Sequence, residues 1–478
     1  MHIKKSFSSF IGTKQFYSGL LVILVPLIIQ QGITSFVNLL DNIMVGQLGT
    51  EEISAVAIVN QIIFIVNLAI FGCLAGVSIF GAQFSGKGDV KGLKYSFRLR
   101  LYLAVLVTAV GIVLLLFSGE SLIAFFLNET EGDSGDIQRT LSQAKEYMGI
   151  SLVGLIPFAV SQSFSSTLKD TGETKQPMAA SIIAIMTNFT LNLILIFGLL
   201  GFPKMGVAGA ALATVIARFV EMFYIVFVTI KRRREFPFVI GAFRSVYIPL
   251  GLIGRILKTG TPLLFNEILW ALGMTIIAQC YSMRGLSAVT AVNINNTVWN
   301  VFSIVMMAMG NAVGIMAGQQ LGADNIEGAK DTVRKLIFFD VVVNTIIGCL
   351  IMLTSPLIPQ LYNTTDEIRT LASQLLLVAG IVLPIEAFTH AAYFTLRSGG
   401  KTVVTFLFDC VFTWAVSLPA AWMLSRYTSV SLVWIFLSVQ LLNLIKVVIG
   451  AVMVKSGIWA RNVVNEPSSA EPAAEANA

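Results

Sequence analysis

The chain has 478 residues, of which 56% are hydrophobic and 12% are charged, with a mean hydropathy of +0.81 and a formal net charge of +6. Soluble domains carry about 25% charged residues, so a soluble protein of this composition would have to bury nearly all of its surface. The composition excludes a soluble globular protein and predicts a membrane protein.

Twelve apolar stretches are long enough to cross a bilayer, since a transmembrane helix needs roughly 20 predominantly apolar residues. In chain order these stretches are 17–44, 53–82, 97–118, 141–166, 178–201, 206–230, 256–280, 286–317, 336–358, 371–395, 403–425 and 431–454. The first is longer than the apolar part of a signal peptide, and we expect it to be a membrane span. The predicted fold is an all-α polytopic membrane protein with 12 transmembrane helices.

Lys and Arg concentrate at the termini and in the even-numbered loops, including the run KRRR at 231–234, whereas the odd-numbered loops hold mainly acids such as Glu51 and Glu120. The positive-inside rule therefore predicts a multi-pass protein of the cell (inner) membrane with both termini cytoplasmic. Basic loops on that side face anionic lipid headgroups. The expected partner is the lipid bilayer, and no nucleic acid is expected.

An internal repeat divides the chain. Residues 76–94 (GVSIFGAQFSGKGDVKGLK) align without gaps on 312–330 (AVGIMAGQQLGADNIEGAK), at an offset near 230 residues. Six helices return the second copy to the same side, so two six-helix lobes related by a pseudo-two-fold axis along the membrane normal are predicted. The predicted parts are a cytoplasmic N-terminus (1–16), an N-lobe (17–230), a cytoplasmic linker (231–255), a C-lobe (256–455) and a cytoplasmic, largely disordered tail (456–478).

Three segments resemble one known family: 40–49 (LDNIMVGQLG), 209–214 (GAALAT) and 386–402, which ends in LRSGGKT. They are similar to the multidrug and toxic compound extrusion (MATE) family of bacteria, and the resemblance covers essentially 16–455. It implies a two-lobe, V-shaped transporter that exports organic cations in exchange for sodium ions or protons. The expected protein is a monomer and not an enzyme.

Polar side chains inside spans are candidates for function, because a charge at the bilayer centre costs at least about 2.5 to 3.5 kcal/mol. Asp41 ends the first span, Asn188 and Asn192 share a helix face at a spacing of four, and Thr214 lies on the next helix. One carboxylate with neutral oxygens suits a hard monovalent cation, and the family resemblance implies the N-lobe cation site here. The alternative interpretation is that Asp41 merely sits at a wet helix end.

Four ionisable residues of the second half are predicted to form a C-lobe site for cation or substrate: Glu267, Glu386, His390 and Asp409. Glu386 stands eleven residues before Arg397, the spacing that the resemblance to NorM-like members implies for their acid, and His390 follows one turn later. A purely structural Glu–His pair is the alternative. Arg218 and Lys446 hold corresponding positions of the two repeats, which favours a structural role for both.

The energy source is expected to be an ion gradient. The stretch 398–402 (SGGKT) lacks the first glycine of a nucleotide-binding loop and follows a membrane helix instead of a strand. No cofactor is therefore expected beyond Na+ or H+ as coupling ion, and no metal other than a monovalent cation. The predicted function is cation-coupled antiport of lipophilic, mostly cationic drugs and toxic compounds by alternating access. The alternatives are a flippase for lipid-linked oligosaccharide, which favours 14 helices and a basic cavity, and a membrane-embedded protein without transport activity.

Overall fold

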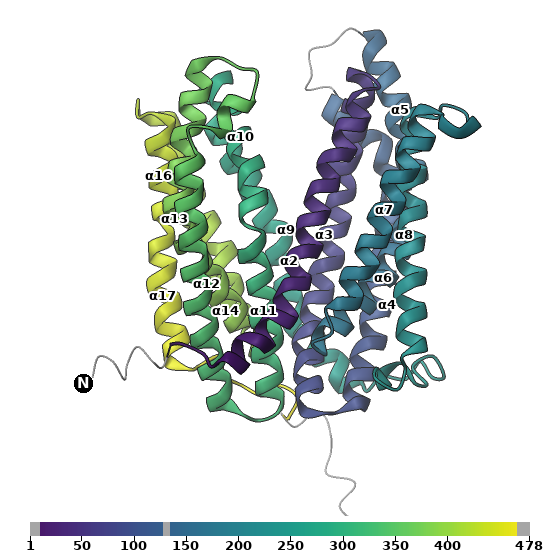
Figure 1. Ribbon diagram of the computed structural model, residues 1–478, viewed down its shortest axis with the longest axis vertical. Helices are drawn as coiled ribbons and strands as arrows, with labels where there is room; N and C mark the ends of the chain where they lie inside the picture. Colours follow the sequence, from purple (N-terminus) through teal and green to yellow (C-terminus); the bar gives the residue numbers. More distant parts are fainter. Residues whose placement is uncertain (1–9, 128–133, 466–478) are drawn as a thin grey trace, which may run out of the picture. The chain divides into compact units, whose positions relative to one another are not determined.

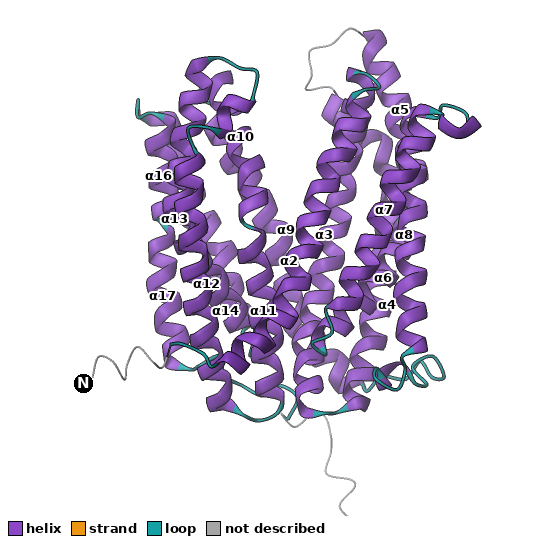
Figure 2. Ribbon diagram, in the orientation of Figure 1, coloured by secondary structure: helices purple, strands orange, loops and turns teal. Residues whose placement is uncertain are grey.

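A computed structural model describes residues 10–127 and 134–465, and this part of the chain contains helices and loops but no strand (Figures 1 and 2). The helices are α2 (Lys14–Gly46), α3 (Thr50–Lys87), α4 (Val90–Leu127), α5 (Ser134–Val153), α6 (Leu155–Asp170), α7 (Lys175–Phe197), α8 (Gly206–Lys231), α9 (Leu250–Ser282), α10 (Leu286–Phe302), α11 (Ile304–Gly322), α12 (Ile326–Thr354), α13 (Asp366–Ser398), α14 (Thr402–Phe406), α15 (Leu418–Tyr427), α16 (Leu432–Leu441) and α17 (Asn443–Ser456). Short 3-10 turns follow α7, α8 and α12 at Leu199–Gly201, Pro237–Val239 and Ile358–Leu361, and two π-helical segments, η4 (Leu407–Val411) and η5 (Thr413–Ser417), separate α14 from α15.

Most of the helical segments are long and apolar enough to span a membrane. Within the described residues there are 11 such spans, or up to 12 if one bent pair is counted as a single span. At 1.5 Å per residue, the 38 residues of α3 reach about 57 Å, well beyond the roughly 30 Å of the hydrocarbon core. The predicted all-α polytopic membrane fold is confirmed. The predicted disorder of the tail concerns mainly 466–478, which lie outside the described residues.

Several predicted spans are interrupted. The span expected at 141–166 is a pair of helices bent by 42° between Val153 and Leu155, and Pro157 in the first turn of α6 has no N–H to continue the preceding helix. The span expected at 286–317 is divided into α10 and α11. The span expected at 403–425 passes through η4 and η5 just before Pro419, which again lacks a donor.

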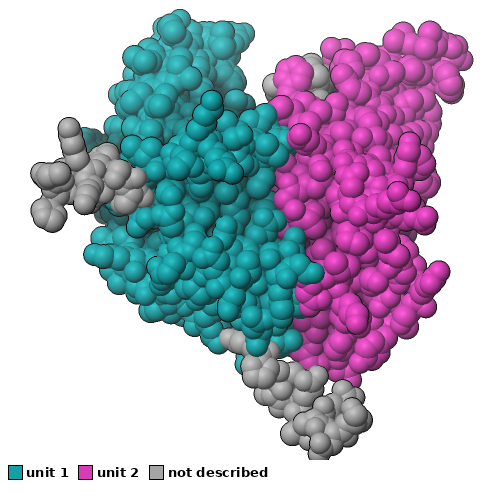
Figure 3. Space-filling model, turned by 60° about the horizontal axis from the view of Figure 1, so that its bottom comes forward, with its two compact units in different colours: residues 1–28, 82–88, 255–478 teal, residues 29–81, 89–254 magenta. Residues whose placement is uncertain are grey.

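The chain divides into two compact units, coloured separately in Figure 3. Unit 1 comprises Met1–Ile28, Ala82–Gly88 and Arg255–Ala478, and unit 2 comprises Ile29–Gly81 and Asp89–Gly254. The start of α2 and the end of α3 thus group with the second half of the chain. The lobe boundaries proposed from the sequence stay a prediction.

Unit 2 contains a buried ion pair between Arg100 of α4 and Asp170 of α6. Nη2 of Arg100 lies 2.5 Å from Oδ2 of Asp170, and the two side chains are 1% and 5% exposed. The same guanidinium donates to Oγ1 of Thr167 at 2.6 Å and to Oγ of Ser78 at 3.0 Å. Since an unpaired buried charge is costly, this cluster fixes α3, α4 and α6 against one another.

Arg98 anchors the connection between α8 and α9. Its guanidinium donates to three backbone carbonyls within 241–247 at distances of 2.6 to 2.9 Å. The neighbouring Phe97 is fully buried and packs edge-to-face on Phe238, with ring centroids 5.3 Å apart. The segment predicted as a linker is therefore folded onto α4.

Unit 1 is built around α13, which packs on α10, α11, α12 and α17. Its largest apolar cluster joins Leu20 and Leu24 of α2 to Val313 of α11 and Leu336 of α12. Because these side chains come from helices far apart in the sequence, burial of apolar surface explains why the first half of α2 belongs to this unit.

Candidate functional site

Asp41 of α2 meets two asparagines of α7 and a threonine of α8. Nδ2 of Asn192 donates to Oδ1 of Asp41 at 2.7 Å and to Oδ1 of Asn188 at 3.3 Å. Nδ2 of Asn188 donates at 3.2 Å to Oγ1 of Thr214, which itself donates to the carbonyl of Ala210. The structure therefore joins all four residues predicted for the N-lobe site in one network within unit 2, which we name the Asp41 cluster.

The Asp41 cluster holds oxygens that other side chains do not saturate. Asn188 and Asn192 are 6% and 2% exposed, yet Oδ1 of Asn192 has no hydrogen-bond partner among the described residues. The amide of Asn188 can be turned over, which brings its Nδ2 to 3.0 Å from Oδ2 of Asp41 and its Oδ1 to 3.2 Å from Oγ1 of Thr214. The cluster thus combines one carboxylate with two side-chain amides and a hydroxyl, which are oxygen-bearing groups of the kind that hard cations take as ligands.

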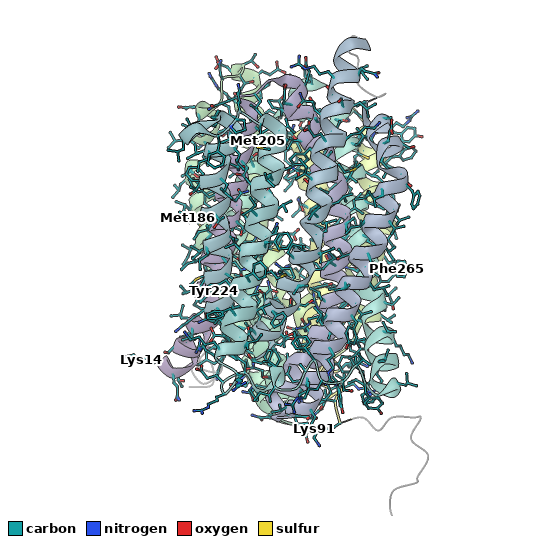
Figure 4. The ribbon with its side chains drawn as sticks, turned by 90° about the vertical axis from the view of Figure 1, so that its right-hand side faces the viewer. Lys14, Lys91, Met186, Met205, Tyr224 and Phe265 are labelled. Atoms are coloured by element: carbon teal, nitrogen blue, oxygen red, sulfur yellow. The ribbon has the colours of Figure 1, made fainter. Side chains whose placement is uncertain are left out.

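The opposite face of α7 lines an apolar groove. At 100° per residue, the residues lining it point away from the face that carries Asn188 and Asn192. The groove has a volume of about 480 Å³. Met186, labelled in Figure 4, lines the groove, and its side chain is 58% exposed. One helix therefore carries a polar cluster on one side and an adaptable apolar surface on the other.

Asp409 lies in the π-helical segment η4 and has a partner on each carboxylate oxygen. Nζ of Lys446 donates to its Oδ1 at 3.0 Å, and Nδ2 of Asn266 donates to its Oδ2 at 3.2 Å. The same amide lies 3.3 Å from the hydroxyl of Tyr393. Single π-turns occur frequently at functional sites because they re-aim side chains without ending the helix. Here η4 presents Asp409 to α9 and α17 together.

Glu386 of α13 accepts a short hydrogen bond from Nδ2 of Asn443 on α17. Lys446 follows Asn443 by one turn of α17 and donates to Asp409. The acid of α9, Glu267, directly follows Asn266, whose amide is bonded to Asp409. The three predicted acids of the C-lobe site are therefore neighbours in unit 1, in a group that we name the Lys446 network and that also contains Asn266, Asn443 and Lys446.

His390 faces a different helix. Its ring packs on Phe394 with centroids 4.9 Å apart and lies so close to α11 that a Cβ on Gly310 would be 2.5 Å from Cε1. No hydrogen bond joins it to Glu386 in the described part of the chain, and its buried Nδ1 has no partner there. A hydrogen bond between Glu386 and His390, whether for proton transfer or for structure, is therefore not formed in this conformation.

Arg218 and Lys446, which correspond in the two repeats, each pair with a carboxylate of their own unit. Arg218 lies 3.2 Å from Glu221, and Lys446 lies 3.0 Å from Asp409. Arg218 also stacks on Phe158, with the guanidinium carbon 4.5 Å from the ring centroid. The repeats thus share the pattern of one intramembrane cation paired with one acid.

Three buried or hydrogen-bonded polar residues were not predicted from the sequence. Asn266 and Asn443 are uncharged amides, and nothing in the sequence separates them from other polar residues of the spans. Asp340 of α12 is 0% exposed and lies inside the predicted span 336–358. A complete search of the spans for acids would have found it.

Comparison with known families identifies the chain. The MatE family model matches residues 26–194 and 262–423, which is more than half of the sequence and covers both repeats. The chain belongs to the MATE family. Members of this family are transporters and not enzymes, as the sequence predicts, and the chain is accordingly a multi-pass membrane protein of a multidrug efflux family that acts on small molecules. The described residues hold at most 12 such spans, which is fewer than the 14 helices that a flippase would favour.

Curated relatives and solved structures agree with this assignment. The chain is 26% identical over 425 residues to the probable multidrug resistance protein YoeA of Bacillus subtilis, covering 86% of this chain and 88% of the relative. It is 24% identical to the probable multidrug resistance protein NorM of Thermotoga maritima, with 89% of both chains covered. The crystal structure of a mutant of the Vibrio cholerae MATE transporter VcmN matches with a TM-score of 0.84 at 17% identity, covering 95% of this chain and 99% of that one. This MATE chain therefore has the fold of the solved transporters.

Proposed function

We propose that this MATE protein is an antiporter that exports lipophilic organic cations in exchange for a sodium ion or proton bound at the Asp41 cluster. The observation that supports the proposal is the geometry around Asp41: one carboxylate within 2.7 Å of Asn192, and a buried amide oxygen of that asparagine with no partner among the described residues. A buried polar oxygen left unpaired is costly, and a bound cation would pair it.

The oxygens of the Asp41 cluster fit sodium as coupling ion. Hard cations take oxygen ligands, and the carboxylate with two amide oxygens and the hydroxyl of Thr214 supplies this chemistry without a second charge. The amide of Asn188 can be placed either way round, and with its nitrogen toward Asp41 it lies 3.0 Å from Oδ2. To hold the ion, both amides would turn their oxygens toward it.

The Lys446 network is proposed to recognise the charge of the substrate. Asp409 is paired with Lys446, whereas Glu386 accepts from the neutral amide of Asn443. A carboxylate that is held by a neutral amide can offset the positive charge of a bound molecule, so recognition by charge would suit a range of organic cations.

An ion gradient supplies enough energy for this exchange. One charge that crosses 100 mV releases about 2.3 kcal/mol. A tenfold uphill step of substrate concentration costs about 1.4 kcal/mol. On the outer side of the membrane the ion would bind at Asp41 and the drug would be released. On the cytoplasmic side the drug would bind and the ion would be released. Alternating access would thus couple drug export to ion entry. The proposal includes a monomer in the cell (inner) membrane with both termini cytoplasmic and with no cofactor.

The test is uptake of the lipophilic cation tetraphenylphosphonium into everted membrane vesicles that contain the full-length protein. Vesicles are energised separately with a sodium gradient and with a proton gradient, and vesicles without the protein serve as the control. We expect accumulation that requires at least one gradient and that exceeds the accumulation of a neutral lipophilic compound of similar size. Uptake indifferent to both gradients, or equal for the neutral compound, would contradict the proposal.

A further inference from the structure

Asp340 and Asn344 form a fully buried polar pair on α12, one helical turn apart. Both residues are 0% exposed. Nδ2 of Asn344 donates to Oδ1 of Asp340 at 2.7 Å and to its backbone carbonyl at 2.9 Å. The second oxygen of each group, Oδ2 of Asp340 and Oδ1 of Asn344, has no hydrogen-bond partner among the described residues. Two unpaired acceptors thus remain on two groups that already touch.

Among the described residues, no basic side chain is paired with or hydrogen-bonded to Asp340. The side chains of the neighbouring turns of α12, such as Leu336 and Ile337, belong to the apolar core of unit 1 together with Val313 of α11 and Ala391 of α13. Helix α11 carries no ionisable residue. The ionisable residues of α2, α12 and α13 include Tyr17, Lys335, Glu386, His390, Tyr393 and Arg397. None of them is hydrogen-bonded to Asp340 in the described part of the chain.

Several of these ionisable residues interact with side chains other than Asp340. Lys335 pairs with Asp331 near the start of α12, and Glu386 is bonded to Asn443. Arg397 stacks on Phe394, with its guanidinium carbon 5.0 Å from the ring centroid. A charged carboxylate at Asp340 would therefore be buried without a counter-ion, which is strongly unfavourable.

A single proton satisfies both unpaired oxygens. A protonated Oδ2 becomes a donor, and the adjacent Oδ1 of Asn344 is an acceptor without a partner in the described structure. The acid and the amide then exchange two hydrogen bonds, one in each direction. A metal ion would fit poorly, because hard cations take about six or more oxygen ligands and the pair offers only two.

The architecture of the repeats does not require an acid here. When the gapless alignment of 76–94 with 312–330 is continued, Asp340 aligns with Ala104 and Asn344 with Thr108. Ala104 of α4 is buried in an apolar cluster of unit 2. The corresponding helix thus packs with alanine at this position, and the acid in α12 serves something other than packing.

We propose that Asp340 is a proton-binding site, in which the protonated carboxyl donates from Oδ2 to Oδ1 of Asn344 and accepts at its Oδ1 from Nδ2 of the same amide. Asn344 is the positioning residue. The site lies in unit 1, on a helix that carries no residue of the Asp41 cluster, so it adds a proton that is separate from the proposed coupling ion. Because the pair is fully buried, this proton exchanges only when water reaches α12.

The test is infrared difference spectroscopy of the purified full-length protein in nanodiscs at neutral pH. A protonated carboxyl in an apolar site gives a carbonyl band separate from those of carboxylates and amides. We expect this band in the wild type, with and without sodium, and its loss in Asp340→Asn. We expect it to persist in Asp41→Asn, the matched control that removes the proposed coupling site, so the two proposals can fail independently.

Asn344→Leu provides a second measurement if Asp340→Asn does not fold. It removes the hydrogen-bond acceptor but leaves the acid, so the band should remain and shift to the frequency of a free carboxyl. If Asn344 had only a structural role and made no hydrogen bond with the protonated acid, the frequency of the band would not change. Bands unchanged in both variants, or a carboxylate band at Asp340 that responds to sodium, would overturn the proposal.

Discussion

Gly86 of α3 touches the backbone of Gln319 of α11: a Cβ on this glycine would lie 1.9 Å from the carbonyl oxygen of Gln319. The contact is reciprocal, since a Cβ on Gly322 would lie 1.9 Å from the carbonyl oxygen of Gln83. Gly86 and Gly322 correspond in the repeat, as do Gln83 and Gln319. The ends of α3 and α11 therefore meet in unit 1 through two equivalent contacts that need a residue without a side chain.

Replacing Gly322 with alanine should destabilise the protein, because the added methyl group overlaps a backbone atom that cannot rotate away. Overpacking of this kind costs typically about 1 to 3 kcal/mol. The measurement is the thermal unfolding midpoint of the purified protein in detergent, which should fall. Gly149→Ala in α5 is the control, since its Cβ would meet nothing within 4 Å and alanine is the better helix former. Equal midpoints for Gly322→Ala and Gly149→Ala would contradict the interpretation.

The buried Arg100–Asp170 pair should show strong coupling between its two members. Removing one partner leaves an uncompensated buried charge, which costs about 3 to 5 kcal/mol, whereas replacing both by apolar residues is often nearly neutral. Arg100→Met should therefore lower the unfolding midpoint markedly, and Arg100→Met with Asp170→Leu should recover most of the loss. If the double variant is less stable than both single variants, the pair contributes through its hydrogen bonds to Ser78 and Thr167 instead.

Asp41→Asn is expected to abolish coupled export while the protein still inserts and folds. The substitution keeps the size of the side chain but removes the carboxylate of the Asp41 cluster. Export would be measured as uptake of tetraphenylphosphonium into everted vesicles that contain equal amounts of the protein. Asp366→Asn, at a side chain that is 95% exposed at the start of α13, is the control and should transport like the wild type. Wild-type export by a well-expressed Asp41→Asn protein would exclude Asp41 as the coupling residue.

Glu386→Gln is expected to weaken binding of cationic substrates more than binding of neutral ones. The amide preserves the acceptor for Asn443 but cannot offset a positive charge. Loss of one favourable charge interaction of about 1.4 kcal/mol corresponds to a tenfold rise in Kd. Binding of a fluorescent cation and of a neutral analogue would be measured by titration, with the exposed Glu367→Gln as the control. Equal losses for both ligands would indicate a structural role for Glu386.

The sequence was sufficient for the fold because hydropathy, charge and the repeat act over long stretches. The spans follow from the rule that a bilayer forces backbone groups into internal hydrogen bonds, which in a chain of this pattern means helices. The four residues of the Asp41 cluster could be grouped because Asn188 and Asn192 share a helix face and because the resemblance to the MATE family implies a cation site at Asp41.

Contacts between side chains of different helices could not be predicted from the sequence in the same way. The pairing of Asp409 with Lys446, and of Glu386 with Asn443, depends on how α17 lies against α13 and η4, and no spacing in the sequence encodes this. The orientation of His390 toward Gly310 was equally hidden, since helical spacing places it only one turn from Glu386. Side-chain partners across helices are set by packing, which local periodicity does not determine.

The ligands of the Asp41 cluster predict which ion drives export. The Asp41 cluster has one carboxylate and neutral oxygens, so we expect export to follow the sodium gradient at fixed membrane potential and to be nearly indifferent to the pH gradient. Asn192→Asp should reverse this preference. Nδ2 of Asn192 lies 2.7 Å from Oδ1 of Asp41, and two carboxylates at such a distance cannot both ionise, so they share a proton. The measurement is export from proteoliposomes clamped with potassium and valinomycin, with sodium and pH gradients varied separately. Wild-type export that tracks only the pH gradient would make Asp41 a protonation switch and would exclude sodium from its cluster.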